Sequence, residues 1–482
     1  MNRAAGTSGP ALSVVVPTHN RCASVFRLLR ALRSDLMHTS ALQPADVEVI
    51  IVSDGSPDDT VDRLQASIDA RDWPFELRIT AHETAQGPGI ARNSGAANAR
   101  GATVLFIDDD IEPFLGALAL HHRMHTDATE RGEVLVVIGA PVPLRNPVDS
   151  LEHIAAWGWW EQQFERMSRP GHRFTYDEVF TGILSMPRAT FETVGRFDSS
   201  LGGCHEDSEL GLRLFRAGAR AAFSRAAGGV HHEVRDTARL LPRKFDEGRA
   251  DVQLLQRWPE LTMVVRATDR LPQLRTADGL LRRNAMNGGW LANAVPRIAI
   301  PVLQQLDRWR LRLTWRRVHG ALLWHCYWRG VAADVGSWPA LEQLQSDCAD
   351  ALIRWQADAH HVRIDLANGL NMAALQLDAL RPDAVTVHLG SDDIGRVNAI
   401  PGAERLHGGH LRRLLATSFS KSLTITLALQ ELRSRAPTHA LSITDDSDTA
   451  QIDAVIDGAP WITHAHGARR QLTEPARPDA PC

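Results

Sequence analysis

The sequence has almost no lysine. Its 53 basic residues include only Lys244 and Lys421, so the other 51 are arginines. Cysteine is also sparse. The five cysteines are scattered, and no two have the spacing of a zinc finger or a redox pair. A disulfide framework and a cysteine zinc site are therefore excluded, and we expect reduced thiols in a reducing compartment.

Long apolar runs are missing as well. Nowhere are 18 consecutive residues apolar and uncharged, so we expect no transmembrane helix. The beginning of the chain, MNRAAGTSGPALSVVVP, has no apolar segment long enough for a secretory signal. The formal net charge of −4 disfavours general nucleic-acid binding, which requires a strongly basic balance. These absences predict a cytoplasmic protein that does not bind nucleic acid.

The first hundred residues alternate between expected strands and helices. Apolar runs at 12–17, 47–56, 76–80 and 102–107 have the lengths of buried strands. Apolar residues between them repeat at helical spacing, at Val25, Leu28, Leu29 and Leu32 and again at Val61, Leu64 and Ile68. This order predicts an α/β fold with a mostly parallel sheet flanked by helices, whose ligands bind beyond the carboxyl ends of the strands.

Three consecutive aspartates follow the fourth expected strand, in the segment VLFIDDDIEP. Like charges at the end of a buried strand are unfavourable unless a cation or water meets them. On an extended chain, Asp108 and Asp110 point to one side and Asp109 to the other. Two carboxylates on one side form an oxygen-rich site suited to Mg²⁺ or Mn²⁺. A solvated acidic turn is the alternative interpretation.

A glycine-rich segment, GPGIARNSG, lies between the third and fourth strands. Arg92 occupies the position of the third glycine in a dinucleotide-binding loop, which disfavours that kind of site. An arginine there can hold a phosphate or a carboxylate as a fixed fork. A glycine-rich turn that enters a helix would explain the glycines but not the arginine.

The segment GGCHEDSELGLRLFRAG predicts a helix over 206–216, with Glu206 and Asp207 in its first turn. Acids in a first turn also interact favourably with the helix dipole, which is the plainer interpretation of this pair. Two histidines follow at His231 and His232, and an imidazole can complete a divalent metal site.

In order and spacing these segments resemble the family 2 inverting glycosyltransferases, which have the GT-A fold. The similar segments are VVVPTHNR, IIVSDGS, GPGIARNSGAANARGATVLFIDDD, TGILSMPRATFETVGRFD, HEDSELGLRLFRAG and VHH. The resemblance covers residues 12–260 and says nothing of the chain beyond 330. It implies metal-dependent, inverting transfer of a sugar from a nucleotide-diphosphate sugar to an acceptor hydroxyl.

The resemblance also implies roles for individual residues. Asp207 matches the catalytic base, and the divalent metal, Mg²⁺ or Mn²⁺, is implied at Asp108, Asp110 and His231. His19 stands where many members have an aromatic side chain. Contacts to the nucleotide sugar are implied at Pro17, Thr18, His19, Asp54, Arg92, Asp108 and Asp109.

The implied partners are a UDP-, GDP- or dTDP-linked sugar donor and a glycan or lipid-linked acceptor, as in polysaccharide biosynthesis. The sequence leaves the sugar, the nucleotide, the acceptor and the oligomeric state open.

The chain changes character near residue 280. Residues 281–330 contain nine arginines, one acid and five tryptophans. One interpretation is a helical pair that buries its tryptophans. The other is an interfacial segment that contacts an anionic membrane surface, which would place the protein peripherally at the inner face of the cell membrane.

We predict five parts along the chain. Beyond the helical segment, residues 361–366 and 384–389 alternate like strands and 410–419 predict a helix, which indicates a small α+β domain. The parts are an N-terminal tail (1–11), the catalytic domain (12–275), the basic tryptophan-rich helical segment (276–335), the C-terminal accessory domain (336–472) and a disordered tail (473–482).

Two other functions compete with transfer. Sugar-phosphate nucleotidyltransferases resemble one another in an essential lysine after a glycine-rich N-terminal loop, but no lysine precedes Lys244 here. The second alternative is a catalytically inactive transferase fold that serves as a binding or scaffold protein. The presence of Asp108, Asp110 and Asp207 disfavours it.

Overall fold

The computed structural model describes residues 9–38, 41–145, 149–201, 204–232, 236–263, 265, 267 and 277–435. By its contacts the chain divides into one unit that ends at Leu423 and another that begins at Thr424. Of the second unit, the structure describes 424–435, the end of helix α15 (Ser420–Arg435). The predicted tail 473–482, and residues 1–8 of the predicted N-terminal tail, lie outside the described residues. The finer five-part division stays a prediction.

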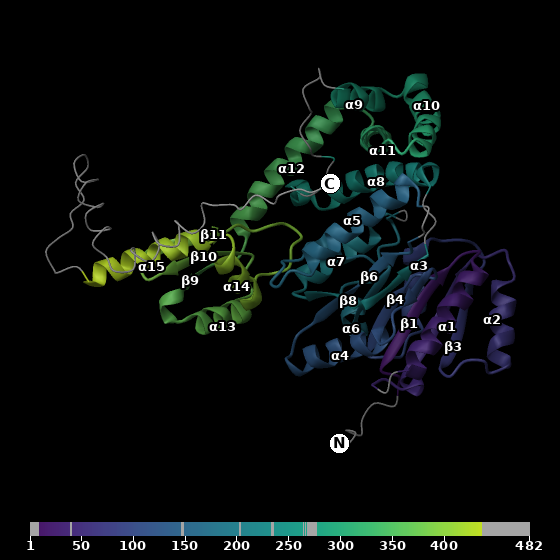
Figure 1. Ribbon diagram of the computed structural model, residues 1–482, viewed down its shortest axis with the longest axis horizontal. Coiled ribbons are helices and arrows are strands. Elements are labelled where there is room, and N and C mark those ends of the chain that lie inside the picture. The colour runs from purple at the N-terminus through teal and green to yellow at the C-terminus, as the bar shows by residue number, and fades with distance from the viewer. Residues whose placement is uncertain are drawn as a thin grey trace, which may run out of the picture. The chain divides into compact units, whose positions relative to one another are not determined.

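A mixed sheet of eight strands forms the centre of the first unit (Figure 1). Its order is β3-β2-β1-β4-β7-β6-β8-β5, and the first four of these strands are parallel, as predicted. β7 runs antiparallel to both β4 and β6. The strands are β1 (Leu12–Thr18), β2 (Val47–Asp54), β3 (Glu76–His82), β4 (Thr103–Ile107), β5 (Ile111–Pro113), β6 (Leu135–Pro143), β7 (Ile183–Pro187) and β8 (Arg220–His231).

Helices cover both faces of this sheet, which is why its central strands are apolar throughout rather than alternating. In β1, Val14 and Val16 pack in the core under α1 and α2, whereas Val15 packs in the core under α3 and α7. The helices of this part are α1 (Cys22–His38), α2 (Thr60–Asp69), α3 (Pro88–Ala97), α4 (Ala117–Glu130), α5 (Leu151–Met167), α6 (Arg188–Thr193), α7 (Glu206–Arg216) and α8 (Thr237–Arg257), with short 3₁₀ turns η1 (Pro44–Asp46), η2 (Tyr176–Glu178) and η3 (Pro259–Met263).

The helix predicted over 206–216 is confirmed with the same bounds as α7. Leu210 and Leu214 are buried as expected. The helical spacing of Leu210, Leu214 and Ala217 also predicts an apolar stripe, but Ala217 is exposed, because the helix has ended and this residue is its C-cap.

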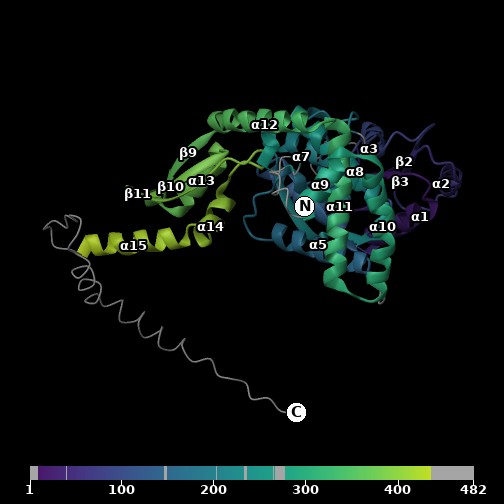
Figure 2. The same ribbon diagram turned by 90° about the horizontal axis from the view of Figure 1, so that it is seen from above.

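The basic tryptophan-rich segment forms helices, as predicted. They are α9 (Ala277–Asn287), α10 (Gly289–Arg308) and α11 (Arg312–Val335), followed by α12 (Trp338–Asp358). Helices α10 and α11 lie side by side (Figures 1 and 2). α11 crosses α8 so closely that a Cβ atom at Gly248 or Gly330 would collide with the backbone of the other helix.

Neither interpretation of the tryptophans holds for all five. Trp315 and Trp328 are buried in helix packing, as the first interpretation expects. Trp290, Trp309 and Trp324 are exposed. Of the helices in the described part of the chain, none is both long and apolar enough to cross a bilayer.

A small three-stranded sheet follows α12, which confirms the extra α+β element. Its strand order is β11-β10-β9, with β9 parallel to β10 and β11 antiparallel. Its elements are β9 (His361–Asp365), η5 (Leu366–Asn368), α13 (Leu370–Leu380), β10 (Ala384–Leu389), β11 (Asp392–Val397) and α14 (Gly408–Ala416). Ala403, between β11 and α14, forms a β-bridge with Thr175 beside the large sheet.

Candidate functional site

The carboxyl ends of β1, β2 and β4 meet at one edge of the sheet, as the sequence predicts. Thr18 at the end of β1 donates its hydroxyl to Asp109 Oδ2 at 2.6 Å. His19 Nδ1 lies 2.6 Å from the carbonyl oxygen of Asp54 at the end of β2. Pro17 is half-buried in β1 and His19 is exposed. Three segments that are far apart in the sequence therefore line one rim.

The aspartates do not alternate as an extended chain would. β4 ends at Ile107, and the chain then turns, because the N–H of Ile111 donates to the carbonyl oxygen of Asp108 at 3.1 Å. The N–H of Asp108 donates to the carbonyl oxygen of Gly182 at 3.0 Å. As a result the carboxylates of Asp109 and Asp110 contact the same arginine, and the carboxylate of Asp108 contacts a different one.

Arg21 is the shared partner. Its Nη1 lies 3.1 Å from Asp109 Oδ1 and 2.7 Å from Asp110 Oδ2. On its other oxygen, Asp110 faces His231 Nε2 at 3.3 Å. The sequence reasoning did not single out Arg21. The signal was available, since three adjacent carboxylates require a nearby cation and Arg21 follows the strand that is paired with β4.

The two neighbouring carboxyls titrate differently. Burial raises the pKa of Asp109 to about 6, although Thr18 and Arg21 act to lower it, and the flanking aspartates add to the rise. Burial alone would also raise the pKa of Asp110. Its contacts with His231 and Arg21 outweigh burial, so the pKa of Asp110 is lowered. The cluster thus holds a charged carboxylate beside one that gives up its proton reluctantly.

Arg92 joins the aspartate cluster to helix α7. Its Nη2 lies 2.7 Å from Asp108 Oδ1, and its Nη1 lies 3.2 Å from Glu206 Oε1. The guanidinium is buried and stacks over Phe197, 5.7 Å from the ring centre. Burial lowers the pKa of Arg92, but the charges of Asp108 and Glu206, with a smaller contribution from Asp207, outweigh burial and raise it. Strand β4 and the first turn of α7 therefore share one cation.

The beginning of α7 carries the predicted base. Asp207 is half-buried, and its Oδ1 accepts a hydrogen bond from the N–H of Ser208 at 2.8 Å. Its neighbour Glu206 is buried against Arg92, and burial followed by repulsion from Asp207 raises the pKa of Glu206. His205 precedes the helix in the left-handed conformation, with φ 63°, and its Nε2 lies 2.9 Å from Asp251 of α8. This contact links the beginning of α7 to α8.

Asp54 holds the loop that enters α3. Its carboxylate accepts hydrogen bonds from the N–H groups of Gln86 at 2.9 Å and Gly87 at 2.8 Å, and His82 Nδ1 lies 2.8 Å away. Burial would raise the pKa of Asp54, but these bonds outweigh it and the pKa is lowered. Nothing in the sequence pattern pointed to His82 as a partner of Asp54. The predicted contact of Asp54 with a nucleotide stays a prediction.

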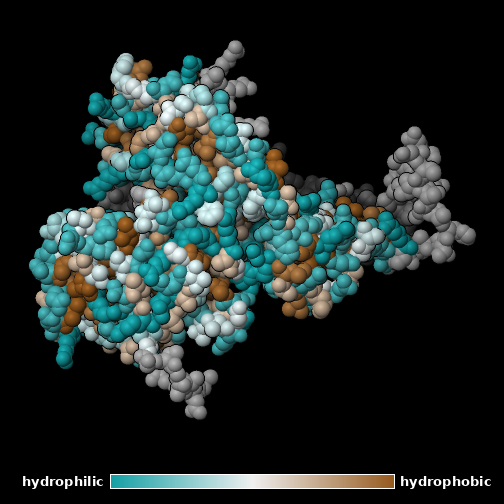
Figure 3. Space-filling view, turned by 180° about the vertical axis from the view of Figure 1, so that it is seen from behind, coloured by the Kyte–Doolittle hydropathy of each residue, from teal (hydrophilic) through white to brown (hydrophobic). Residues whose placement is uncertain are grey.

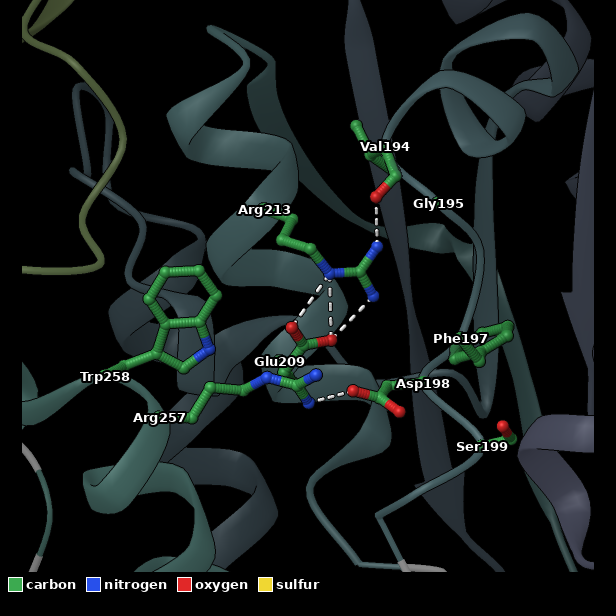
Figure 4. A pocket seen from close by; sticks show the side chains of 9 residues that line it. All are labelled: Val194, Gly195, Phe197, Asp198, Ser199, Glu209, Arg213, Arg257 and Trp258. Atoms are coloured by element: carbon green, nitrogen blue, oxygen red, sulfur yellow. Dashed lines mark hydrogen bonds and ion pairs between the residues drawn. The ribbon is translucent and has the colours of Figure 1, made fainter.

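A pocket of about 480 Å³ lies beside Arg92 and the aspartate cluster (Figure 4). Its charged walls are paired with one another, Arg213 with Glu209 and Arg257 with Asp198. Phe197 belongs to the pocket and also lies under Arg92, so the pocket adjoins the cluster. The lining residues are Val194, Gly195, Phe197, Asp198, Ser199, Glu209, Arg213, Arg257 and Trp258.

The predicted metal ligands are only partly brought together. Asp110 and His231 are in contact, while Asp108 is engaged by Arg92. Carboxylate oxygens with one imidazole suit Mg²⁺ or Mn²⁺, so this donor set fits a divalent cation at Asp110 and His231. His232 is placed differently, with Nε2 2.5 Å from Glu112 Oε2.

A second group of potential metal ligands lies in the segment that leads into α14 and in the first turn of that helix. Within the described part of the chain, only Glu404, His407 and His410 place three such donor atoms all within 4.8 Å of one another. Their atoms already have partners. Glu404 accepts from the N–H groups of Phe174 and Ala221, each at 3.1 Å, and lies 3.2 Å from His410 Nε2.

Arginines surround this second group. Arg220 Nη2 lies 2.9 Å from His407 Nδ1, and Arg173 donates through Nε to the carbonyl oxygen of Glu404 at 2.8 Å. Burial, then His410 and the charges of Arg220, Arg381 and Arg173, lower the pKa of His407 to about 2. The charges of these arginines disfavour a further positive charge beside His407. The group instead joins the small sheet to the large one.

An α/β sheet with an acidic rim, and an acid pair at the start of the facing helix, is the arrangement that the GT-A resemblance implies. The family model of glycosyl transferase family 2 matches residues 13–140, so this part of the chain is similar to that family. The resemblance read from the sequence is confirmed for this part.

Individual relatives are similar to about half of the chain. A pre-mycofactocin glycosyltransferase of Mycobacterium tuberculosis is 26% identical over 263 residues, 53% of this chain and 50% of the relative. A validoxylamine A glucosyltransferase of Streptomyces hygroscopicus subsp. jinggangensis is 28% identical over 254 residues, 46% of this chain and 55% of the relative. The chain thus spans about half the length of these curated relatives. Among solved structures, the mannosyltransferase PcManGT of Pyrobaculum calidifontis, in complex with GDP-Man and Mn²⁺, aligns with a TM-score of 0.43 and 18% identity over 66% of this chain and 86% of that one.

Proposed function

We propose that the protein is a glycosyltransferase that moves a sugar from a nucleoside-diphosphate sugar to an acceptor hydroxyl, with inversion at the anomeric carbon. The observation that carries the proposal is the Arg92 bridge. It brings Asp108 at the end of β4 and Glu206 at the start of α7 onto one guanidinium, and so places Asp207 beside the acidic rim. The matched family domain and the glycosyltransferase relatives support the same reaction class.

Asp207 would act as the general base. It takes the proton from the acceptor hydroxyl while the oxygen forms a bond to the anomeric carbon. The bond from that carbon to the phosphate oxygen breaks, and the nucleoside diphosphate leaves with the electron pair. The half-buried carboxylate of Asp207 is accessible to an acceptor and is held at the start of a fixed helix. A positioned base contributes about 10²–10⁴-fold in rate.

The acidic rim would hold the diphosphate end of the donor. Asp110 and His231 are the residues that fit a divalent cation, and a bound cation supplies charge neutralisation to the departing diphosphate. Arg21 now pairs with Asp109 and Asp110, and a guanidinium also suits a phosphate. Thr18 keeps Asp109 in place through its hydroxyl. Pro17, His19 and Asp54 border the same rim, where we propose the nucleoside lies.

The first experiment is a thermal-shift screen with UDP-, GDP- and dTDP-linked sugars, each with and without Mn²⁺. We expect at least one donor to raise the melting temperature, more so with the metal. Donor hydrolysis and transfer are then measured with that sugar. A protein that binds a donor but neither hydrolyses nor transfers it would be the inactive binding protein, and a protein that binds none would refute the proposal.

A further inference from the structure

Helix α10 has two apolar faces, and only one of them is covered. Its inner face packs against α11, α5 and α8 through Leu303 and Leu306. A second apolar stripe consists of Leu291, Ile298, Val302 and Trp309, whose side chains are 52%, 66%, 43% and 63% exposed. Successive members are 7, 4 and 7 positions apart. At about 100° per residue these four directions agree within roughly 40°.

The stripe continues around the corner between α10 and α11. There Leu311 and Leu313 are exposed, the latter by 76%. Trp290 at the other end of α10 is also 76% exposed. Figure 3 shows hydrophobic side chains among hydrophilic ones in the upper part of the molecule, where Figure 1 places α9–α11. We call the stripe, this corner and Trp290 the α10 surface.

The charge around the α10 surface is predominantly positive. Residues 289–317 contain six arginines, at 297, 308, 310, 312, 316 and 317, and all six are exposed. They contain one acid, Asp307, so the formal balance is six minus one, or +5, in a chain of net charge −4. Asp307 is engaged by the N–H of Leu151 at 3.0 Å and by Arg310 at 3.2 Å.

We propose that the α10 surface docks on an anionic phospholipid membrane without crossing it. Exposed tryptophans beside arginines are the side chains that settle at the boundary between lipid headgroups and acyl chains. The excess positive charge complements anionic headgroups. The acidic overall charge disfavours nucleic acid as the partner. The inference does not depend on the proposed function, because it needs no donor or acceptor.

Side-chain contacts connect α11, which carries part of the α10 surface, to α7, which carries Asp207. Tyr327 of α11 hydrogen-bonds to Asp251 of α8, and Asp251 in turn contacts His205 at the start of α7. Membrane docking would therefore fix the orientation of Asp207 relative to the lipid surface. This last step rests on the proposed function: with Asp207 as the base, the arrangement suits an acceptor carried on a lipid.

The test is flotation of the full chain with vesicles of phosphatidylcholine alone or of equal parts phosphatidylcholine and phosphatidylglycerol. We expect binding to the anionic vesicles, loss of binding in high salt, and no binding to the neutral vesicles. The variant R312Q/R316Q/R317Q should bind about 100-fold more weakly, since each basic residue near the surface contributes about fivefold. The variant W309S/L313S should also bind more weakly. All five side chains are exposed, so circular dichroism should show an unchanged fold.

The matched control is R354Q/L375S, which removes an exposed arginine on α12 and an exposed leucine on α13. It should float like the wild type. Failure of the full chain to float with anionic vesicles would overturn the proposal, as would wild-type flotation of the triple variant. Sedimentation without lipid gives a further check. A dimer that W309S/L313S dissociates would mean that the α10 surface binds a second copy instead.

Discussion

Two of the regions in which carboxylates meet imidazoles, the ends of the sheet strands and the beginning of α14, differ in their surroundings. At the strand ends, Asp110 contacts both the exposed Arg21 and His231, and Asp207 is half-buried. Beside α14, Glu404 and His410 are buried, and their polar atoms are bonded to protein groups. The second group is geometrically the tighter one. The comparison teaches that closeness of donor atoms is not our reason for proposing a cation site: Arg173 and Arg220 contact the second group, whereas the strand ends bring three aspartates together.

Replacing the proposed base should have the largest effect. Asp207→Asn should lower the rate of transfer by about 10²–10⁴-fold, because the acceptor hydroxyl loses its proton acceptor. Donor binding, followed by thermal shift, should persist. Asp127→Asn, an exposed acid of α4, is the matched control and should transfer normally. Turnover within a few-fold of wild type in the Asp207 variant would remove this residue from the role.

Removing the cation that links β4 to α7 should mainly cost stability. In Arg92→Met, Asp108 and Glu206 lose their shared partner while Glu206 stays buried. We expect the free energy of unfolding to fall by about 3–5 kcal/mol, measured by urea titration. Arg63→Met breaks an exposed pair with Asp59 and should change stability by less than about 1 kcal/mol. Equal effects of the two variants would show that Arg92 is not a structural link.

Substitutions in the group beside α14 should change the stability of the protein and not its transfer activity. Glu404→Gln removes an acceptor from the N–H groups of Phe174 or Ala221 and should cost about 1–3 kcal/mol. Asp393→Asn changes an exposed acid of the same small sheet and should cost little. Transfer per folded molecule should be unchanged in both. A loss of metal-dependent donor binding in the Glu404 variant would reverse the roles that we assign to the two groups.

A smaller, pH-dependent effect should appear at Glu178, which supports the segment bridged by Ala403. Burial would raise the pKa of Glu178, but His172, the N–H of Thr175 and Arg166 outweigh it and lower the pKa. A lowered pKa stabilises the folded state above the unfolded pKa of about 4.3, and this stabilisation is lost as the pH falls through the folded value.

The measurement is chemical denaturation of the wild type and Glu178→Gln from about pH 7 to pH 3. The wild type should be more stable by about 1 kcal/mol at neutral pH. This difference should shrink on acidification. A difference that grows as the pH falls would contradict the assignment.

The sequence predicts local structure well where burial is periodic or continuous. Strands β1 to β4 and helix α7 follow from their apolar positions, and the convergence of Thr18, Asp54 and the aspartates follows from parallel strand topology. The turn after Ile107 was not predictable in this way, because the alternation rule holds only while the strand continues.

Contacts between residues far apart in the sequence could not be predicted from it. Arg173 and Arg220 lie about two hundred residues before Glu404 and His407, and no periodicity links them. The division of the tryptophans into buried and exposed ones depends on how α11 packs against α8, which composition does not encode. Likewise, the role of Arg21 depends on the turn that carries Asp109 and Asp110.

Isothermal titration calorimetry with UDP and GDP, with and without Mn²⁺, tests the account most directly when wild type, Asp110→Asn and His410→Gln are compared. We expect at least one nucleotide to bind the wild type about tenfold or more tightly with Mn²⁺. Asp110→Asn should abolish this gain, and His410→Gln should retain it. A gain that survives in Asp110→Asn, or one that disappears in His410→Gln, would contradict the assignment of the metal and the diphosphate to the strand ends.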